Sequence, residues 1–170
     1  MANNPAGKPI EDGHHADIND VADYIISKMD EASWLNVLKL QKLLYYVQAW
    51  TLAIENVRCF DGEFQAWVHG PVNREIYDRF KDEKSMYSRV RARDMRKGFD
   101  PEEMDLDVRT NINSVLEVYG DFSDDQLEEM THREQPWIDA REGCSPRERC
   151  TNDIDEITMR NYYAARLSDN

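Results

Sequence analysis

The residues best suited to acid–base chemistry lie together in the tetrapeptide THRE at 131–134. A histidine beside a carboxylate is the usual make-up of a general base, because the carboxylate orients the imidazole. Glu134, or another acid, could do this for His132. A general base also needs a nucleophile or a bound substrate, and the sequence identifies neither. Two interpretations stay open: a small hydrolase that uses His132, and the favoured one, in which Thr131 and His132 close a helix end with Trp137 packed beside them.

Standard catalytic signatures are absent from the sequence. It contains no HExxH, GxSxG, GxGxxG or CxxC motif and no phosphate-binding GxxxxGK[ST] loop. Its 7 glycines leave little material for loops that bring backbone close to a phosphate. These features favour a binding protein without a cofactor over an enzyme.

The cysteines indicate a reducing compartment. Cys59, Cys144 and Cys150 form no CxxC pair, and any pairing leaves one of them over, so we expect no disulfide framework. A metal site built from Cys144, Cys150 and His132 would lack the paired knuckle of a zinc site, and plain thiols are the better interpretation. The longest apolar runs fall far short of the roughly 20 residues of a membrane span. We therefore expect a cytoplasmic protein that makes no membrane contact.

Charge is unevenly distributed along the chain. The net charge is −13 over 170 residues, with −5 on residues 1–80, +4 on residues 81–97 and −12 on residues 98–170. Such a field repels nucleic acid and attracts a basic partner, although an acidic surface also serves solubility alone. The basic stretch at 84–97 could contact phosphates, but the acidic run after it opposes that, and we expect no nucleic-acid partner. We predict instead a loop that contacts a protein partner through Tyr87, Arg89, Arg91, Arg93 and Arg96.

Hydrophobic periodicity predicts a mainly α fold that would position these residues. The stretch 35–54 is apolar on most sides, which indicates a central helix buried by others, with Ser33 as its N-cap and Asn56 at its end. We expect a single compact domain of about seven helices around it. A small β-hairpin is predicted near 58–69, with a turn at Asp61-Gly62 and a strand break at Gly70-Pro71. Residues 1–16 read as a flexible leader and residues 17–167 as the domain, with a basic loop excursion at 84–97.

Three separated stretches of the sequence resemble one known family. They are KLQKLLYYVQAWTLA at 39–53, FQAWVHGPVNREIYDRFK at 64–81 and VYGDFSDDQLEEMTHREQPWIDAR at 118–141. In this order they are similar to the hallmark segments of the Panacea domain, the SocA-like, phage-associated antitoxin family. The resemblance extends over roughly residues 17–167. Departures are the leader, the basic excursion and Ala49, where a glycine is usual.

The resemblance also identifies candidate site residues, which are either structural or partner-binding. These motif positions are Lys42, Tyr46, Gln48, Trp50, Trp67, Gly70, Pro71, Tyr77, Thr131, His132, Pro136 and Trp137.

The resemblance implies an antitoxin that neutralises a cognate protein toxin, encoded beside it, by direct binding and without enzymatic activity. In the SocA-like branch it implies an alternative, an adaptor that delivers its toxin or another client to the ClpXP protease. The third alternative is the His132-dependent hydrolase.

Overall fold

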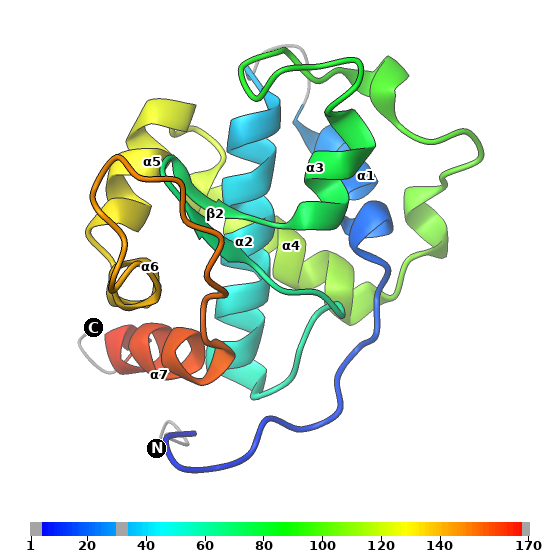
Figure 1. Ribbon diagram of the computed structural model, residues 1–170. Coiled ribbons are helices and arrows are strands. Elements are labelled where there is room, and N and C mark those ends of the chain that lie inside the picture. Colours follow the sequence, from blue (N-terminus) through cyan, green and yellow to red (C-terminus); the bar gives the residue numbers. More distant parts are fainter. Residues whose placement is uncertain (1–4, 30–33, 168–170) are drawn as a thin grey trace.

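The computed structural model describes residues 5–29 and 34–167 of the chain. Within these ranges the chain forms seven α-helices and one antiparallel hairpin, which confirms the predicted mainly α fold (Figure 1). The elements are α1 (Ile18–Lys28), α2 (Val37–Glu55), β1 (Gln65–Trp67), β2 (Gly70–Val72), α3 (Arg74–Phe80), α4 (Leu106–Tyr119), α5 (Asp124–His132), α6 (Gln135–Ala140) and α7 (Glu156–Leu167). Two short 3-10 helices, η1 (Ala92–Asp94) and η2 (Pro101–Glu103), lie between α3 and α4. None of the described helices is long and apolar enough to cross a membrane.

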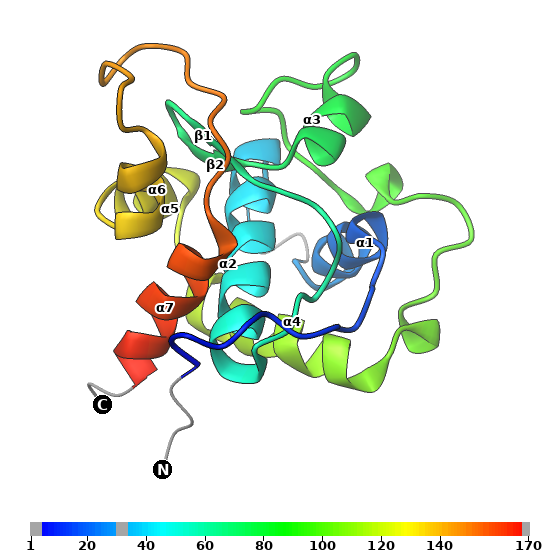
Figure 2. The ribbon, with the colours of Figure 1, turned by 60° about the horizontal axis from the view of Figure 1, so that its bottom comes forward.

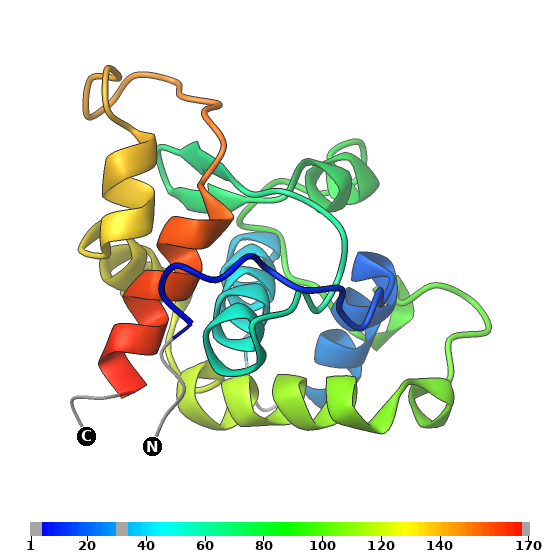
Figure 3. The same ribbon diagram turned by 90° about the horizontal axis from the view of Figure 1, so that it is seen from below.

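Helix α2 is the centre of the fold, as the sequence predicted. All of its residues are buried except Trp50, Ile54 and Glu55. Figure 3 looks nearly along this helix and shows α7, α4, α1 and the hairpin arranged around it. The N-cap is Asn36, whose side chain accepts a hydrogen bond from Lys39 N. The predicted cap, Ser33, lies outside the described residues.

The end of α2 is also where the sequence placed it. Asn56 adopts φ 59°, and its N–H donates to Leu52 O, so it ends the helix in the left-handed conformation that asparagine tolerates.

Two glutamines of α2, seven residues apart, bond to backbone outside the helix: Gln41 to the junction of β2 and α3, and Gln48 to the irregular segment between α2 and β1. Gln41 accepts from Asn73 N (2.8 Å) and donates to Asn73 O (3.0 Å). Gln48 accepts from Cys59 N (2.8 Å) and donates to Phe60 O (2.7 Å). Because both side chains are buried, these hydrogen bonds satisfy polar groups that would otherwise be desolvated without a partner.

The hairpin is present but begins later than predicted. β1 and β2 pair Trp67 with Gly70, so the turn is formed by Val68 and His69 and not by Asp61-Gly62. The expected strand break at Gly70-Pro71 is wrong, because both residues belong to β2. A proline is tolerated there because each strand of a two-stranded sheet has a free edge, so Pro71 need not donate to a second neighbour.

Part of the predicted leader forms backbone hydrogen bonds to a later segment of the chain. Residues 9–16 run beside residues 56–60 (Figure 2), and Glu11 N, His14 N and Ala16 N donate to the carbonyls of Asn56, Arg58 and Cys59. Side chains in this segment are mostly polar. A hydrophobicity pattern therefore does not reveal this backbone pairing. The domain boundary at residue 16 stays a prediction.

The basic loop excursion at 84–97 has little regular secondary structure, as expected. It nevertheless packs against the start of α2. Val90 is buried, and its N–H donates to Leu35 O at 2.8 Å. Leu38 N donates to Met86 O, also at 2.8 Å. The loop therefore supplies backbone partners to the start of α2 and closes that end of the central helix.

Gln48→Leu tests how strongly α2 holds the irregular segment. The substitution keeps the side-chain volume but leaves buried backbone groups of residues 59 and 60 without partners, so we expect the free energy of unfolding to fall by about 3 kcal/mol. Chemical denaturation followed by circular dichroism measures it. Gln135→Leu, the same change at an exposed position, is the control and is expected to stay within about 0.5 kcal/mol of wild type. Equal stabilities of the two variants would contradict this account.

Candidate functional site

The three family-like segments meet at the hairpin. β2 packs against both α2 and α5, and β1 packs against α6, so the hairpin lies between the first and third segments. The motif positions thereby become spatial neighbours. What their side chains contact decides whether they form a site or a structural core.

Lys42 is fully buried beneath the hairpin. Its Nζ donates to Pro71 O at 3.1 Å. Gly70 makes room for it: at φ 108° a Cβ on this residue would lie 2.4 Å from Lys42 Cε and 2.9 Å from Thr131 Oγ1. Gly70 and Pro71 thus enclose the end of the Lys42 side chain, which is buried and not exposed to solvent.

Burial dominates the electrostatics of this region. Desolvation lowers the pKa of Lys42 to about 7, against a smaller raising effect of the Glu128 carboxylate. Glu128 also lies 2.7 Å from His69 Nδ1 and 3.9 Å from His132 Nε2. One carboxylate therefore faces a lysine and two histidines beneath and beside the turn.

The His132 ring packs against neighbouring residues of the same chain. Its ring stacks on Trp137 with centroids 4.1 Å apart, and Trp137 Nε1 donates to Trp67 O at 2.9 Å. Burial lowers the pKa of His132, and Glu128 partly opposes this. The Thr131 hydroxyl is buried and donates to Glu128 O. Trp137 thus packs beside His132, and Thr131 bonds to the last turn of α5, whereas a helix-closing role of His132 itself stays a prediction.

Of the two options left open by the sequence, Glu134 or another acid, it is another acid, Glu128, that faces His132, whereas Glu134 bonds elsewhere. Its Oε1 accepts hydrogen bonds from Tyr46 Oη (2.6 Å) and Tyr163 Oη (3.0 Å). Burial raises the pKa of Glu134, against the lowering effect of these two tyrosines and of Arg166, whose Nη1 lies 3.6 Å from Oε2. The carboxylate joins α2 to α7 at the start of α6.

Aromatic rings extend this cluster toward the surface. Tyr46 stacks on Tyr119 with centroids 4.0 Å apart, and Trp50 Nε1 donates to Tyr119 Oη at 2.9 Å. Among the motif positions, Tyr46 is thus an interior residue and Trp50 lies at the margin of the core.

A cleft beside the hairpin is lined by residues of both candidate sets, the family-motif positions and the basic loop at 84–97. It has a volume of about 540 Å³ and is lined by Trp67 and Tyr77 from the motif positions, Tyr87 from the basic loop, and Arg147 and Arg149. The rings of Trp67 and Tyr77 lie 4.9 Å apart. Pro136, the remaining motif position, is buried at the start of α6.

The arginines of the basic loop do not form one patch. Arg96 pairs with Asp20 and, at 2.7 Å, with the fully buried carboxylate of Asp23 on α1. Arg89 lies over the Trp34 ring at 4.7 Å. Arg91 and Arg93 are exposed. Arg96 therefore fastens the loop to α1, which sequence spacing could not show because its partners lie more than 70 residues earlier.

The prediction that the cysteines form no disulfide is wrong. Cys144 and Cys150 are joined as a disulfide across the loop between α6 and α7, whereas Cys59 is buried and free. In the described part of the chain, no group of three or more His, Cys, Asp and Glu side chains is placed to hold a metal ion.

Sequence reasoning missed Glu128, Tyr119 and Tyr163. Glu128 stands four residues before His132, a spacing that places two side chains on one face of a helix and would have indicated it. Tyr119 and Tyr163 reach the cluster from distant helices, and no local pattern predicts that.

The comparisons with known proteins identify the family of the chain. The family model "Antitoxin SocA-like, Panacea domain" matches residues 40–138, more than half of the chain, and the chain belongs to this family. The protein is also similar to Antitoxin SocA of Caulobacter vibrioides (strain NA1000 / CB15N), with 29% identity over 137 residues that cover 75% of this chain and 71% of that protein. No solved structure matches it.

Lys42 generates a prediction on pH dependence. Its pKa falls from 10.5 to about 7 on folding, so the unfolded chain binds more protons between these values and stability rises with pH there. Between pH 7 and pH 9 the lysine contributes a gain of about 2 kcal/mol in unfolding free energy, which Lys42→Met should remove. Denaturant unfolding at pH 7, 8 and 9 measures the difference. Exposed Lys81→Met should keep the wild-type slope, and parallel curves for Lys42→Met and wild type would contradict the assignment.

Proposed function

We propose that this protein is an antitoxin that neutralises a protein toxin encoded beside it by binding the toxin directly. The observation that carries the proposal is membership of the SocA-like Panacea family. The similarity to Antitoxin SocA supports the same role. The protein would act in the cytoplasm, where it meets a toxin made in the same cell.

The geometry favours binding over catalysis. His132 is stacked on Trp137, Glu134 is engaged by two tyrosines, and Thr131 donates to a backbone carbonyl. These side chains serve contacts within the chain. The net charge of −13 supports a partner with a basic surface, because opposite fields speed association.

Co-expression tests the proposal. The product of the neighbouring open reading frame should stop growth when produced alone, and the wild-type chain should restore growth and co-purify with it. His132→Phe keeps a planar ring on Trp137 and removes the acid–base group, so this variant should restore growth equally well. A harmless neighbouring product would contradict the antitoxin proposal, and loss of rescue by a folded His132→Phe variant would favour the hydrolase.

The abundance of the toxic product separates binding from delivery to a protease. Direct neutralisation leaves its amount unchanged on an immunoblot while its effect on growth disappears. A fall in abundance that requires ClpXP would instead support the adaptor alternative.

A further inference from the structure

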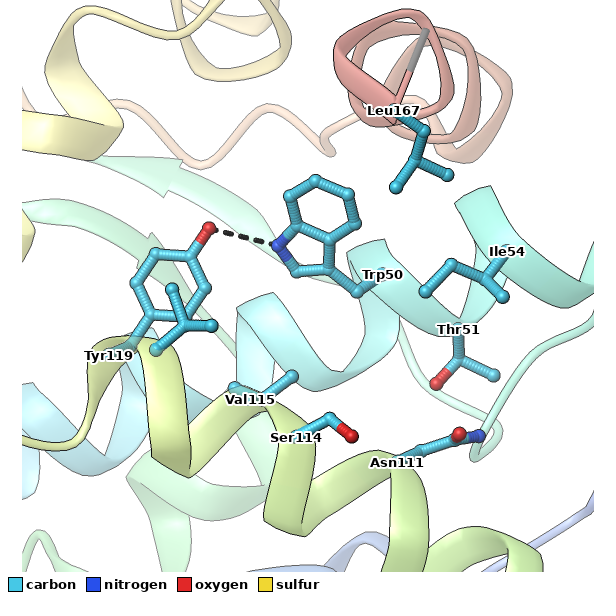
Figure 4. A pocket seen from close by; sticks show the side chains of 9 residues that line it. Trp50, Thr51, Ile54, Asn111, Ser114, Val115, Tyr119 and Leu167 are labelled. Atoms are coloured by element: carbon cyan, nitrogen blue, oxygen red, sulfur yellow. Dashed lines mark hydrogen bonds between the residues drawn. The ribbon is translucent and has the colours of Figure 1, made fainter. Parts of the chain in front are cut away.

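An apolar groove lies directly outside the Trp50–Tyr119 pair (Figure 4). It has a volume of about 270 Å³ and is formed by side chains of α2, α4 and the last turn of α7. Trp50 and Tyr119 form its inner wall, joined by the hydrogen bond between them. The groove is therefore built on rigid, packed residues, which favours a preformed binding surface.

Three of the eight large apolar side chains that are exposed in the described chain line this groove. Ile54 is 64% exposed, Val118 is 61% exposed and Leu167 is 39% exposed, and all three line it. They come from three different helices, so no single amphipathic pattern explains their exposure. Contiguous exposed apolar surface of this kind is a mark of an interaction site.

The charges beside the groove are acidic. Glu55 follows Ile54 and accepts from Asn111 Nδ2, a residue of the groove wall, at 2.6 Å. Glu117 precedes Val118 on α4 and is exposed. Glu55 is also contacted by His14 Nε2 at 3.3 Å. On the last turn of α7, Arg166 is directed to Glu134 and lies over the Tyr162 ring at 4.7 Å. An apolar groove with acidic neighbours fits an apolar segment that carries basic residues at its edges.

The shape of the site indicates the conformation of its occupant. The walls are side chains of helices whose backbone groups bond within each helix, so an added strand has no edge to join. A helix needs only a groove for anchors spaced at i, i+3 or i+4, and i+7. A second copy of this chain is disfavoured because it would bring another net charge of −13 to an acidic surface.

We propose that this groove binds an amphipathic helix of the toxin, with an apolar face seated between Ile54, Val118 and Leu167 and lysines or arginines beside it. The proposal rests on the antitoxin function proposed above. It adds the surface and the chemistry of the partner segment.

Val118→Arg tests the groove, with Leu106→Arg as the matched control. Both residues lie on α4 and are similarly exposed, at 61% and 66%, but only Val118 lines the groove. The probe is the purified product of the neighbouring open reading frame. We expect Val118→Arg to weaken its binding at least tenfold and to lose growth rescue, while Leu106→Arg matches wild type and both variants keep the wild-type melting temperature.

A second variant keeps the test independent of Val118. Glu117→Lys reverses a charge beside the groove without filling it, and should weaken binding, with a smaller effect at high salt. Wild-type binding by both Val118→Arg and Glu117→Lys would overturn the groove while leaving the antitoxin function intact. Loss of binding in Tyr87→Ala alone would place the toxin in the hairpin cleft instead. If the wild-type chain itself neither binds nor rescues, the proposed function fails, and the groove proposal falls with it.

Discussion

The fold depends on one constraint: a helix buried on nearly every side must find hydrogen-bond partners for each polar side chain it carries. Lys39, Gln41, Lys42 and Gln48 are all buried on α2, and each bonds to backbone of a neighbouring segment. An unpaired polar group in that position would cost several kcal/mol. The chain around α2 is therefore fixed by these contacts, including parts with little regular structure of their own.

This constraint explains why so short a hairpin holds its place. Strands of three residues give few ladder hydrogen bonds, and an isolated hairpin is only marginally stable in water. Here three side chains donate hydrogen bonds to backbone carbonyls in or next to the hairpin. Lys42 donates to Pro71 O, Gln41 donates to Asn73 O, and Arg141 Nη1 donates to Ala66 O at 2.8 Å. Side chains from the first and third family-like segments therefore contact the hairpin and the residue that follows it, between α2 and α5–α6.

The sequence predicted the parts of the fold that follow from local pattern. The long apolar run revealed α2, and Asn56 marked its end. Helix α5 likewise begins with a capping box formed by Ser123 and Gln126, whose spacing is a local sequence signal. The hairpin position was wrong because Asp61-Gly62 carries the stronger turn signal, whereas the actual turn at 68–69 has none. Its place is set by Lys42, which is distant in sequence. The Cys144–Cys150 disulfide likewise followed from no motif.

The candidate site was less predictable than the fold for the same reason. Motif positions such as Lys42 and His132 were found, and so was Trp137 beside His132, but Glu128, the carboxylate that faces both Lys42 and His132, was not. The groove beside Trp50 joins residues of three helices that no single window of sequence contains. Long-range packing creates such a surface, and only the structure shows it.

Hydrogen–deuterium exchange of the chain, alone and with the product of the neighbouring open reading frame, tests the central claim most directly. If that product is a toxin that binds the groove, amides in the second half of α4 and at the end of α2 should become protected, while those of the hairpin at 65–72 stay unchanged. Protection confined to the hairpin and the loop at 84–97 would contradict the groove. No protection anywhere would contradict toxin binding itself.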